Sequence, residues 1–206
     1  LRSFFSIRAI RYLEDKIRVV RTGSDLTELK KQVDYEFDVG SFYRIDFIKR
    51  TTAVIKKFAQ LRFTKNYKYA ITMTNNEGKM TSIIDDLKKD SNFTIKTSCS
   101  REEFIEIAKK TRCAVYNSKI EGSPVSPLEA GIVGCLPILV DEKWSREWLK
   151  GLDYPLYYKN LDELPRMIEM AHKNYDVLIE KLHNYFRKEF NCIKQTQKLR
   201  EVILEF

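Results

Sequence analysis

Apolar positions along the chain fall into two alternating patterns. Short, nearly continuous apolar runs predict strands at Phe37–Val39, Tyr69–Thr74, Phe93–Lys96, Cys113–Tyr116, Leu136–Val140 and Pro155–Tyr158. Stretches with helical spacing separate them and predict helices at Asp46–Leu61, Met80–Lys89, Ser100–Lys110, Ser126–Gly134 and Glu142–Lys150. The alternation predicts βαβ units with right-handed crossovers, and therefore a Rossmann-like α/β fold in which helices flank a parallel sheet.

The two ends of the chain depart from this alternation. A long helical region is expected from Leu161 to Phe190, and a last helix at about Ile193–Leu204. Residues 1–34 do not fit cleanly and suggest a helix, a short strand at Arg18–Val20 and a turn at Thr22–Asp25. We therefore divide the chain into an entry segment (1–34), a Rossmann-like domain (35–190) and a C-terminal helix (191–206).

The composition of the chain indicates which classes of binding partner to expect. The 206 residues carry a net charge of +8, which favours anionic partners such as nucleotides, nucleic acid or an acidic membrane face. Solvated helix faces are a simpler explanation for much of that charge, and nothing in the sequence indicates base recognition. No apolar run approaches the roughly 18 residues of a membrane span, so membrane contact, if any, is expected to be peripheral.

The cysteines and histidines argue against a metal site. Cys99, Cys113, Cys135 and Cys192 lack paired metal spacing, and a reducing, cytoplasmic location is the natural expectation. Cys113 and Cys135 lie in apolar runs and are expected to be core residues. The two histidines, His172 and His183, fall in a charged helical segment and are expected at the surface.

Two acids stand out in the stretch between the strands that end at Tyr116 and begin at Leu136. Glu121 precedes Gly122 in a loop, and Glu129 falls in the first turn of the next helix. Both would open onto the carboxyl edge of the sheet, where open α/β folds bind ligands. A simpler explanation exists for each: Glu121 is an exposed loop acid, and Glu129 closes a capping box with Ser126 as N-cap.

The same stretch carries a resemblance to a known family. Glu121-Gly-Ser-Pro-Val-Ser-Pro-Leu-Glu129-Ala, followed by Gly134-Cys-Leu-Pro-Ile-Leu-Val140, resembles the signature of retaining, nucleotide-sugar-dependent glycosyltransferases of the GT-B fold, family 4. The turn at Arg18–Asp25 and the segment Val39–Phe58 look similar to parts of the same enzymes. The resemblance covers nearly the whole chain but only the C-terminal, donor-binding half of such an enzyme. It therefore implies an N-terminal, acceptor-binding domain that is missing from this chain.

The resemblance implies roles for individual residues. Arg44 and Lys49 match the basic pair that neutralises the diphosphate leaving group, so neither a metal nor another cofactor is expected. Glu121 would contact the transferred sugar near the reacting carbon, and Glu129 would hold the ribose hydroxyls. Donors to the diphosphate would come from the segment after Glu121, namely from Gly122, Ser123, Val125 and Ser126.

Two positions depart from the family pattern. Tyr43 stands immediately before Arg44, where the family usually has glycine, and Pro124 replaces a glycine and removes one N–H donor. The leading hypothesis is a donor domain that transfers a sugar from a nucleotide-diphosphate sugar with retention of configuration. The alternative is a non-catalytic glycosyltransferase-like module that binds a polyanion or a protein partner.

Overall fold

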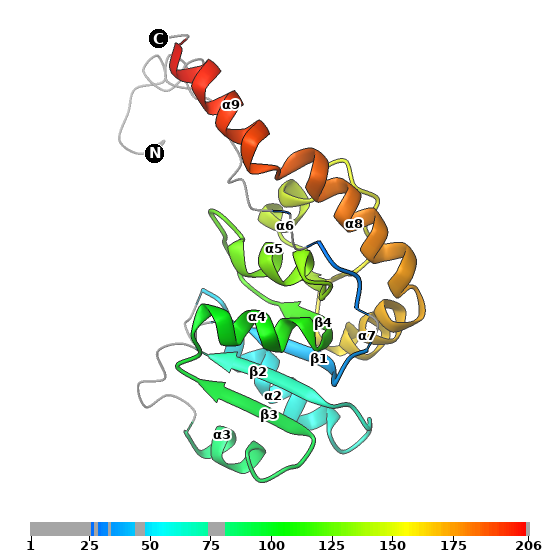
Figure 1. Ribbon diagram of the computed structural model, residues 1–206. Helices are drawn as coiled ribbons and strands as arrows, with labels where there is room; N and C mark the ends of the chain where they lie inside the picture. Colours follow the sequence, from blue (N-terminus) through cyan, green and yellow to red (C-terminus); the bar gives the residue numbers. More distant parts are fainter. Residues whose placement is uncertain (1–25, 27–28, 33, 44–47, 74–80, 205–206) are drawn as a thin grey trace, which may run out of the picture.

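A computed structural model of the chain describes residues 26, 29–32, 34–43, 48–73 and 81–204. Arg44, most of the expected entry segment and the turn expected at 75–78 lie outside these described residues. Between the gaps the structure shows an α/β domain with helices on both sides of one sheet (Figure 1).

The sheet has six parallel strands in the order β3-β2-β1-β4-β5-β6. Their bounds are β1 (Phe37–Phe42), β2 (Tyr69–Met73), β3 (Phe93–Thr97), β4 (Thr111–Tyr116), β5 (Leu136–Val140) and β6 (Tyr157–Tyr158). The chain runs outward from β1 to β3 and then returns to the other side of β1 at β4. This reversal separates the loops that follow β1 and β4 and leaves a crevice at their carboxyl ends.

The described helices are α2 (Thr51–Leu61), α3 (Thr81–Leu87), α4 (Arg101–Lys109), α5 (Val125–Ile132), α6 (Lys143–Trp148), α7 (Leu164–Lys173), α8 (Tyr175–Glu189) and α9 (Cys192–Leu204). Figure 1 shows α4 in front of the sheet and α2 behind it, while α9 extends away from the body. Helix α7 packs on β4 and β5, and α8 packs on α5. The sheet is therefore covered on both faces, which explains why β2 and β5 are buried along their whole length.

Several sequence expectations are confirmed. All six strands expected from Phe37 onward form, and the helix expected from Ser100 begins there, with a reciprocal capping box between Ser100 and Glu103. Cys113 and Cys135 are fully buried, and burial raises the pKa of both thiols. The helix expected at Glu142–Lys150 forms as α6, and its Trp148 packs against Phe186 and Phe190.

Other expectations were wrong. Helix α2 begins at Thr51 rather than at residue 46, because Ile48–Arg50 form a turn and Arg50 adopts a left-handed conformation with φ of 50°. His183 is buried rather than exposed: its Nε2 donates to the carbonyl of Gly131 at 2.9 Å and so ties α8 to α5. The region from Leu161 to Phe190 is divided at Asn174, between α7 and α8.

Candidate functional site

A cavity of about 370 Å³ opens at the carboxyl edge of the sheet. Four segments form its walls: the end of β1 with the turn after it, the end of β2, the connection from β3 to α4 with the start of α4, and the β4–α5 loop with the start of α5. Its lining comprises Phe42, Tyr43, Lys49, Thr72, Met73, Cys99, Ser100, Arg101, Phe104, Glu121, Ser123, Pro124, Val125, Ser126, Pro127 and Glu129. Both acids singled out in the sequence therefore line a single cavity.

Glu121 is held at one end of this cavity by two donors. The Tyr43 hydroxyl donates to its Oε1 at 2.7 Å, and the Lys49 ammonium forms a hydrogen-bonded ion pair with the same oxygen. The side chains of Glu121 and Lys49 are only 8% and 14% exposed. The interpretation of Glu121 as an exposed loop acid was therefore wrong, because a buried carboxylate is retained only where donors or cations compensate its desolvation.

Hydrogen bonds to backbone carbonyls fix the loop that carries Glu121. The Lys119 N–H donates to the carbonyl of Ile48 at 2.8 Å, which joins the β4–α5 loop to the turn after β1. The Ser118 hydroxyl donates to the carbonyl of Ile120 at 2.7 Å, and Trp144 Nε1 donates to the carbonyl of Ser118 at 2.7 Å. These bonds bring Lys49 and Glu121 together although they are distant in sequence.

Glu129 also lines the cavity and does not cap its helix. Helix α5 begins at Val125 with Pro124 at the N-cap, and none of the described side chains caps it. The Ser126 hydroxyl instead donates to the carbonyl of Phe42 at 3.0 Å. The capping-box interpretation was therefore wrong, because the helix starts two residues earlier than expected and Ser126 lies inside it.

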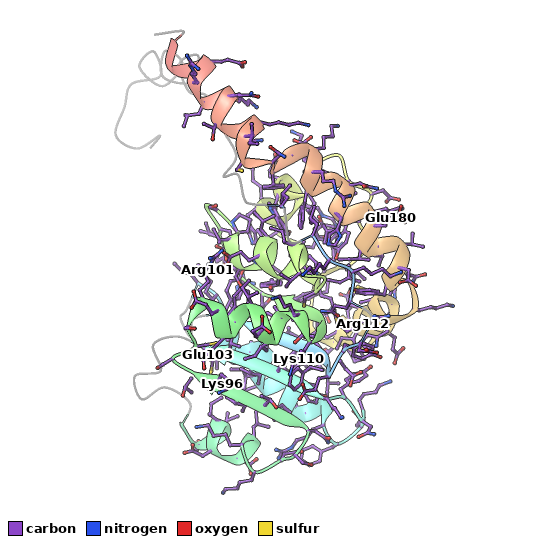
Figure 2. The ribbon with its side chains drawn as sticks, viewed as in Figure 1. Lys96, Arg101, Glu103, Lys110, Arg112 and Glu180 are labelled. Carbon is purple, nitrogen blue, oxygen red and sulfur yellow. The ribbon has the colours of Figure 1, made fainter. Side chains whose placement is uncertain are left out.

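Glu129 is instead paired with a cation from a neighbouring helix. Its Oε1 accepts a hydrogen bond from Arg101 Nε at 2.8 Å, and its side chain is 16% exposed against 72% for Arg101. Figure 2 shows Arg101 at the start of α4, near α5. Arg101 thus reaches across the rim of the cavity to an acid on its wall.

The remaining predicted site residues lie around the same loop. Ser123, Val125 and Ser126 line the cavity, and Gly122 follows Glu121 directly. In this structure the Val125 N–H donates to the carbonyl of Ser123 at 2.9 Å. A Cβ placed on Gly122 would meet nothing within 4 Å, so the fold itself does not require glycine there. The roles of these residues toward a ligand stay predictions.

Two residues that hold the acids of the cavity were not predicted as site residues from the sequence. Tyr43 was noted only because it replaces a glycine of the family pattern, and Arg101 was taken simply as part of a helix start. Neither side chain carries a local signal, because each finds its carboxylate partner only through the folded sheet. Within the described ranges, there is no group of three or more His, Cys, Asp or Glu side chains that could hold a metal ion.

The described fold is that of the GT-B glycosyltransferases. The chain has 16% identity and a TM-score of 0.71 to S. aureus TarM in complex with fondaparinux, alpha-GlcNAc-glycerol and UDP, covering 96% of this chain and 42% of TarM. A glycosyltransferase from Rickettsia africae gives 14% identity and a TM-score of 0.72, with 93% of this chain and 57% of that one covered. Anabaena HepE in complex with UDP-glucose gives 11% identity and 0.67, with 92% and 57% covered.

The comparisons also limit what the chain represents. It spans only about half the length of these similar structures, which is consistent with the expected C-terminal half of a GT-B enzyme. No protein-family model and no curated protein sequence matches it. In the part of the chain that the structure describes, no helix is both long and apolar enough to cross a membrane.

Proposed function

We propose that the chain is the donor-binding half of a retaining glycosyltransferase, which transfers a sugar from a nucleotide-diphosphate sugar to an acceptor held by an upstream half. One observation carries this proposal: Lys49, Glu121 and Glu129 converge on one cavity at the crevice between β1 and β4. The fold supports it, since the similar structures are glycosyltransferases and two of them contain UDP or UDP-glucose.

The chemistry gives each residue a role. The bond from the anomeric carbon to the diphosphate oxygen breaks, a bond to the acceptor oxygen forms, and the acceptor proton passes to the diphosphate. Negative charge builds up on the departing oxygen, and fixed cations stabilise it most where water is excluded. Lys49 provides one such cation at 14% exposure, and we assign the second to Arg44. With these two cations the proposal requires neither a metal nor a cofactor.

Each of the two acids is assigned to a different sugar ring of the donor. Glu121 lies at the same end as Lys49 and is assigned to the transferred sugar, whose hydroxyls can donate to its carboxylate. Glu129 is assigned to the ribose of the nucleotide. Its bond to Arg101 uses Oε1, and a carboxylate has about four acceptor positions, so a ribose diol can bind without breaking that pair. Gly122, Ser123, Val125 and Ser126 surround the diphosphate between them.

The test is nucleotide binding to the 206-residue chain by calorimetry, using UDP, GDP and ADP. Lys49→Ala and Glu129→Ala should each weaken the preferred nucleotide about tenfold or more, because each removes a charge-assisted contact. Lys57→Ala is the matched control, since Lys57 is 15% exposed and paired with Asp162 but does not line the cavity. Failure of all three nucleotides to bind would remove the proposal.

Retention of configuration and the need for an acceptor half are tested on the complete enzyme. With the upstream half supplied, the product glycoside should keep the anomeric configuration of the donor, as read from its proton NMR coupling. An inverted product would contradict the retaining assignment but leave the donor site intact. A cytoplasmic location is part of the proposal, and cell fractionation would check it.

A further inference from the structure

Resting on the proposed function, we propose that Tyr43 is a positioning residue that holds Glu121 for the donor sugar. Its hydroxyl binds Oε1 of Glu121, which directs the carboxylate so that Oε2 can accept from a sugar hydroxyl. Tyr43 should therefore govern the affinity that the sugar adds to the nucleotide, rather than the affinity for the nucleotide itself.

The ring of Tyr43 is held rigidly enough to do this. Tyr43 follows β1 directly, and its ring packs edge-on against Tyr116 of β4, with centroids 5.2 Å apart. Tyr116 is itself completely buried. The hydroxyl of Tyr158 on β6 donates to Asn117 Oδ1 at 3.0 Å, directly after Tyr116. The phenol that meets Glu121 is thus braced by the centre of the sheet.

The two donors to Glu121 differ in whether they are also assigned to the diphosphate. In the described parts of the chain, both hydrogen bonds to Glu121 end on Oε1. Lys49 is also the cation assigned to the diphosphate, so substrate competes for its charge. Tyr43 is not assigned to the diphosphate. Burial and the neighbouring Glu121 raise the pKa of the Tyr43 hydroxyl far above its ordinary value, so it remains a donor.

A neutral donor is needed for a physical reason. When Lys49 turns toward a diphosphate, a carboxylate only 8% exposed would lose its charged partner. An unsatisfied buried acceptor is costly, and more so when it is charged. The Tyr43 bond keeps Glu121 in place through that change. Glycine, which the family resemblance leads one to expect before Arg44, could supply no such hydroxyl.

The test compares each nucleoside diphosphate with its sugar conjugates on the whole chain. UDP, GDP and ADP are titrated by calorimetry alone and as their glucose, galactose, mannose and N-acetylglucosamine conjugates. We expect the best conjugate to bind more tightly than its diphosphate in the unmodified chain. Tyr43→Phe should weaken that conjugate by about tenfold, as for a lost hydrogen bond to a charged group, and leave the diphosphate unchanged.

Two further variants separate positioning from simple packing. Tyr67→Phe is the matched control, because the Tyr67 hydroxyl is buried without a hydrogen-bond partner in the described structure, and its removal should change neither affinity. In a Glu121→Ala background, which removes the acceptor oxygen, Tyr43→Phe should cause no further loss, because the two residues act through one contact.

The outcomes are distinguishable. Equal weakening of diphosphate and conjugate by Tyr43→Phe, or an additive loss in the double variant, would show that Tyr43 only forms the cavity wall and would overturn the inference. A diphosphate that binds as well as all of its conjugates would also overturn it. Absence of any nucleotide binding by the unmodified chain would instead refute the proposed function.

Discussion

At the scale of the residue, each acid of the cavity is held by a partner from another element: Tyr43 and Lys49 bind Glu121, and Arg101 binds Glu129. Glu121 and Glu129 could be placed at the sheet edge because a loop and a helix start that follow a parallel strand must lie there. Their partners, Tyr43 and Arg101, could not be predicted. Tyr43 lies 78 positions from Glu121 and Arg101 lies 28 from Glu129, so only the strand order brings each pair together.

Two glycines allow a prediction that separates folding from binding. Gly134 has φ of +100°, and a Cβ there would lie 2.8 Å from the carbonyl oxygen of Lys30, whereas one on Gly122 would meet nothing within 4 Å. Gly134→Ala should therefore lower the free energy of unfolding by about 2 kcal/mol or more, and Gly122→Ala should leave it nearly unchanged. Denaturant unfolding measures both.

The Gly122→Ala variant also tests the binding site. If the loop after Glu121 approaches the diphosphate, Gly122→Ala should weaken nucleotide binding in a protein of unaltered stability. Unchanged binding would mean that the ligand passes elsewhere.

At the scale of the element, two similar sequences behave differently. Ser100 and Glu103 form a capping box on α4, but Ser126 and Glu129 do not form one on α5. The sequence pattern is the same in both. The difference arises because Pro124, rather than Ser126, occupies the N-cap of α5, which leaves Ser126 to bind Phe42 and Glu129 to face the cavity. Local pattern alone could not predict that two-residue shift.

The difference between the starts of α4 and α5 predicts different effects when the glutamate of each is removed. Glu103→Ala removes one half of a capping box and should lower the free energy of unfolding by roughly 0.5–1 kcal/mol. Glu129→Ala removes only a partly exposed ion pair, so its effect on stability should be smaller, while nucleotide binding should weaken about tenfold or more. Thermal or denaturant unfolding and calorimetry of both variants provide the comparison. Stability losses in the opposite order would restore the capping explanation for Glu129.

The contact between α8 and α5 predicts a pH dependence. Burial lowers the pKa of His183 below its ordinary value of 6.5. The unfolded chain therefore binds a proton at a higher pH than the folded chain, and stability is full above about pH 6.5 and falls as the pH drops through that value. The slope is at most about 1.4 kcal/mol per pH unit.

His183→Gln is the variant that checks this, because an amide can still donate to the Gly131 carbonyl but does not titrate. Its free energy of unfolding should stay flat between pH 7.5 and 5.5, where that of the unmodified chain declines. The carboxylates whose pKa is lowered, such as Asp141 and Asp176, act only in a more acidic range. An equal decline in the variant would assign the effect to other groups.

At the scale of the whole molecule, the sequence predicted almost the whole fold. It did not predict that many of the positively charged side chains form ion pairs. The alternation of buried strands and amphipathic helices admits few topologies besides a parallel α/β sheet. The excess of cations suggested a polyanion surface, but several cations on α2 and just after it are paired. Lys57 contacts Asp162 at 2.6 Å, Arg62 contacts Asp86 at 2.9 Å, and Lys65 contacts Glu169 at 2.7 Å. Such pairing reduces the field that a polyanion would meet.

The distinction between a nucleotide site and a polyanion surface predicts a difference in thermal unfolding. A ligand at about 100 times its dissociation constant stabilises the folded state by about 2.7 kcal/mol, which for a chain of this size corresponds to a rise in Tm of about 5–10 °C. We expect that rise with the preferred nucleoside diphosphate at both low and high salt, because the cavity holds its Lys49 and Glu121 largely away from solvent. Heparin or duplex DNA should raise Tm little, and only at low salt, since such binding depends on counterion release. A large rise with a polyanion, together with none for any nucleotide, would favour the binding module over the transferase.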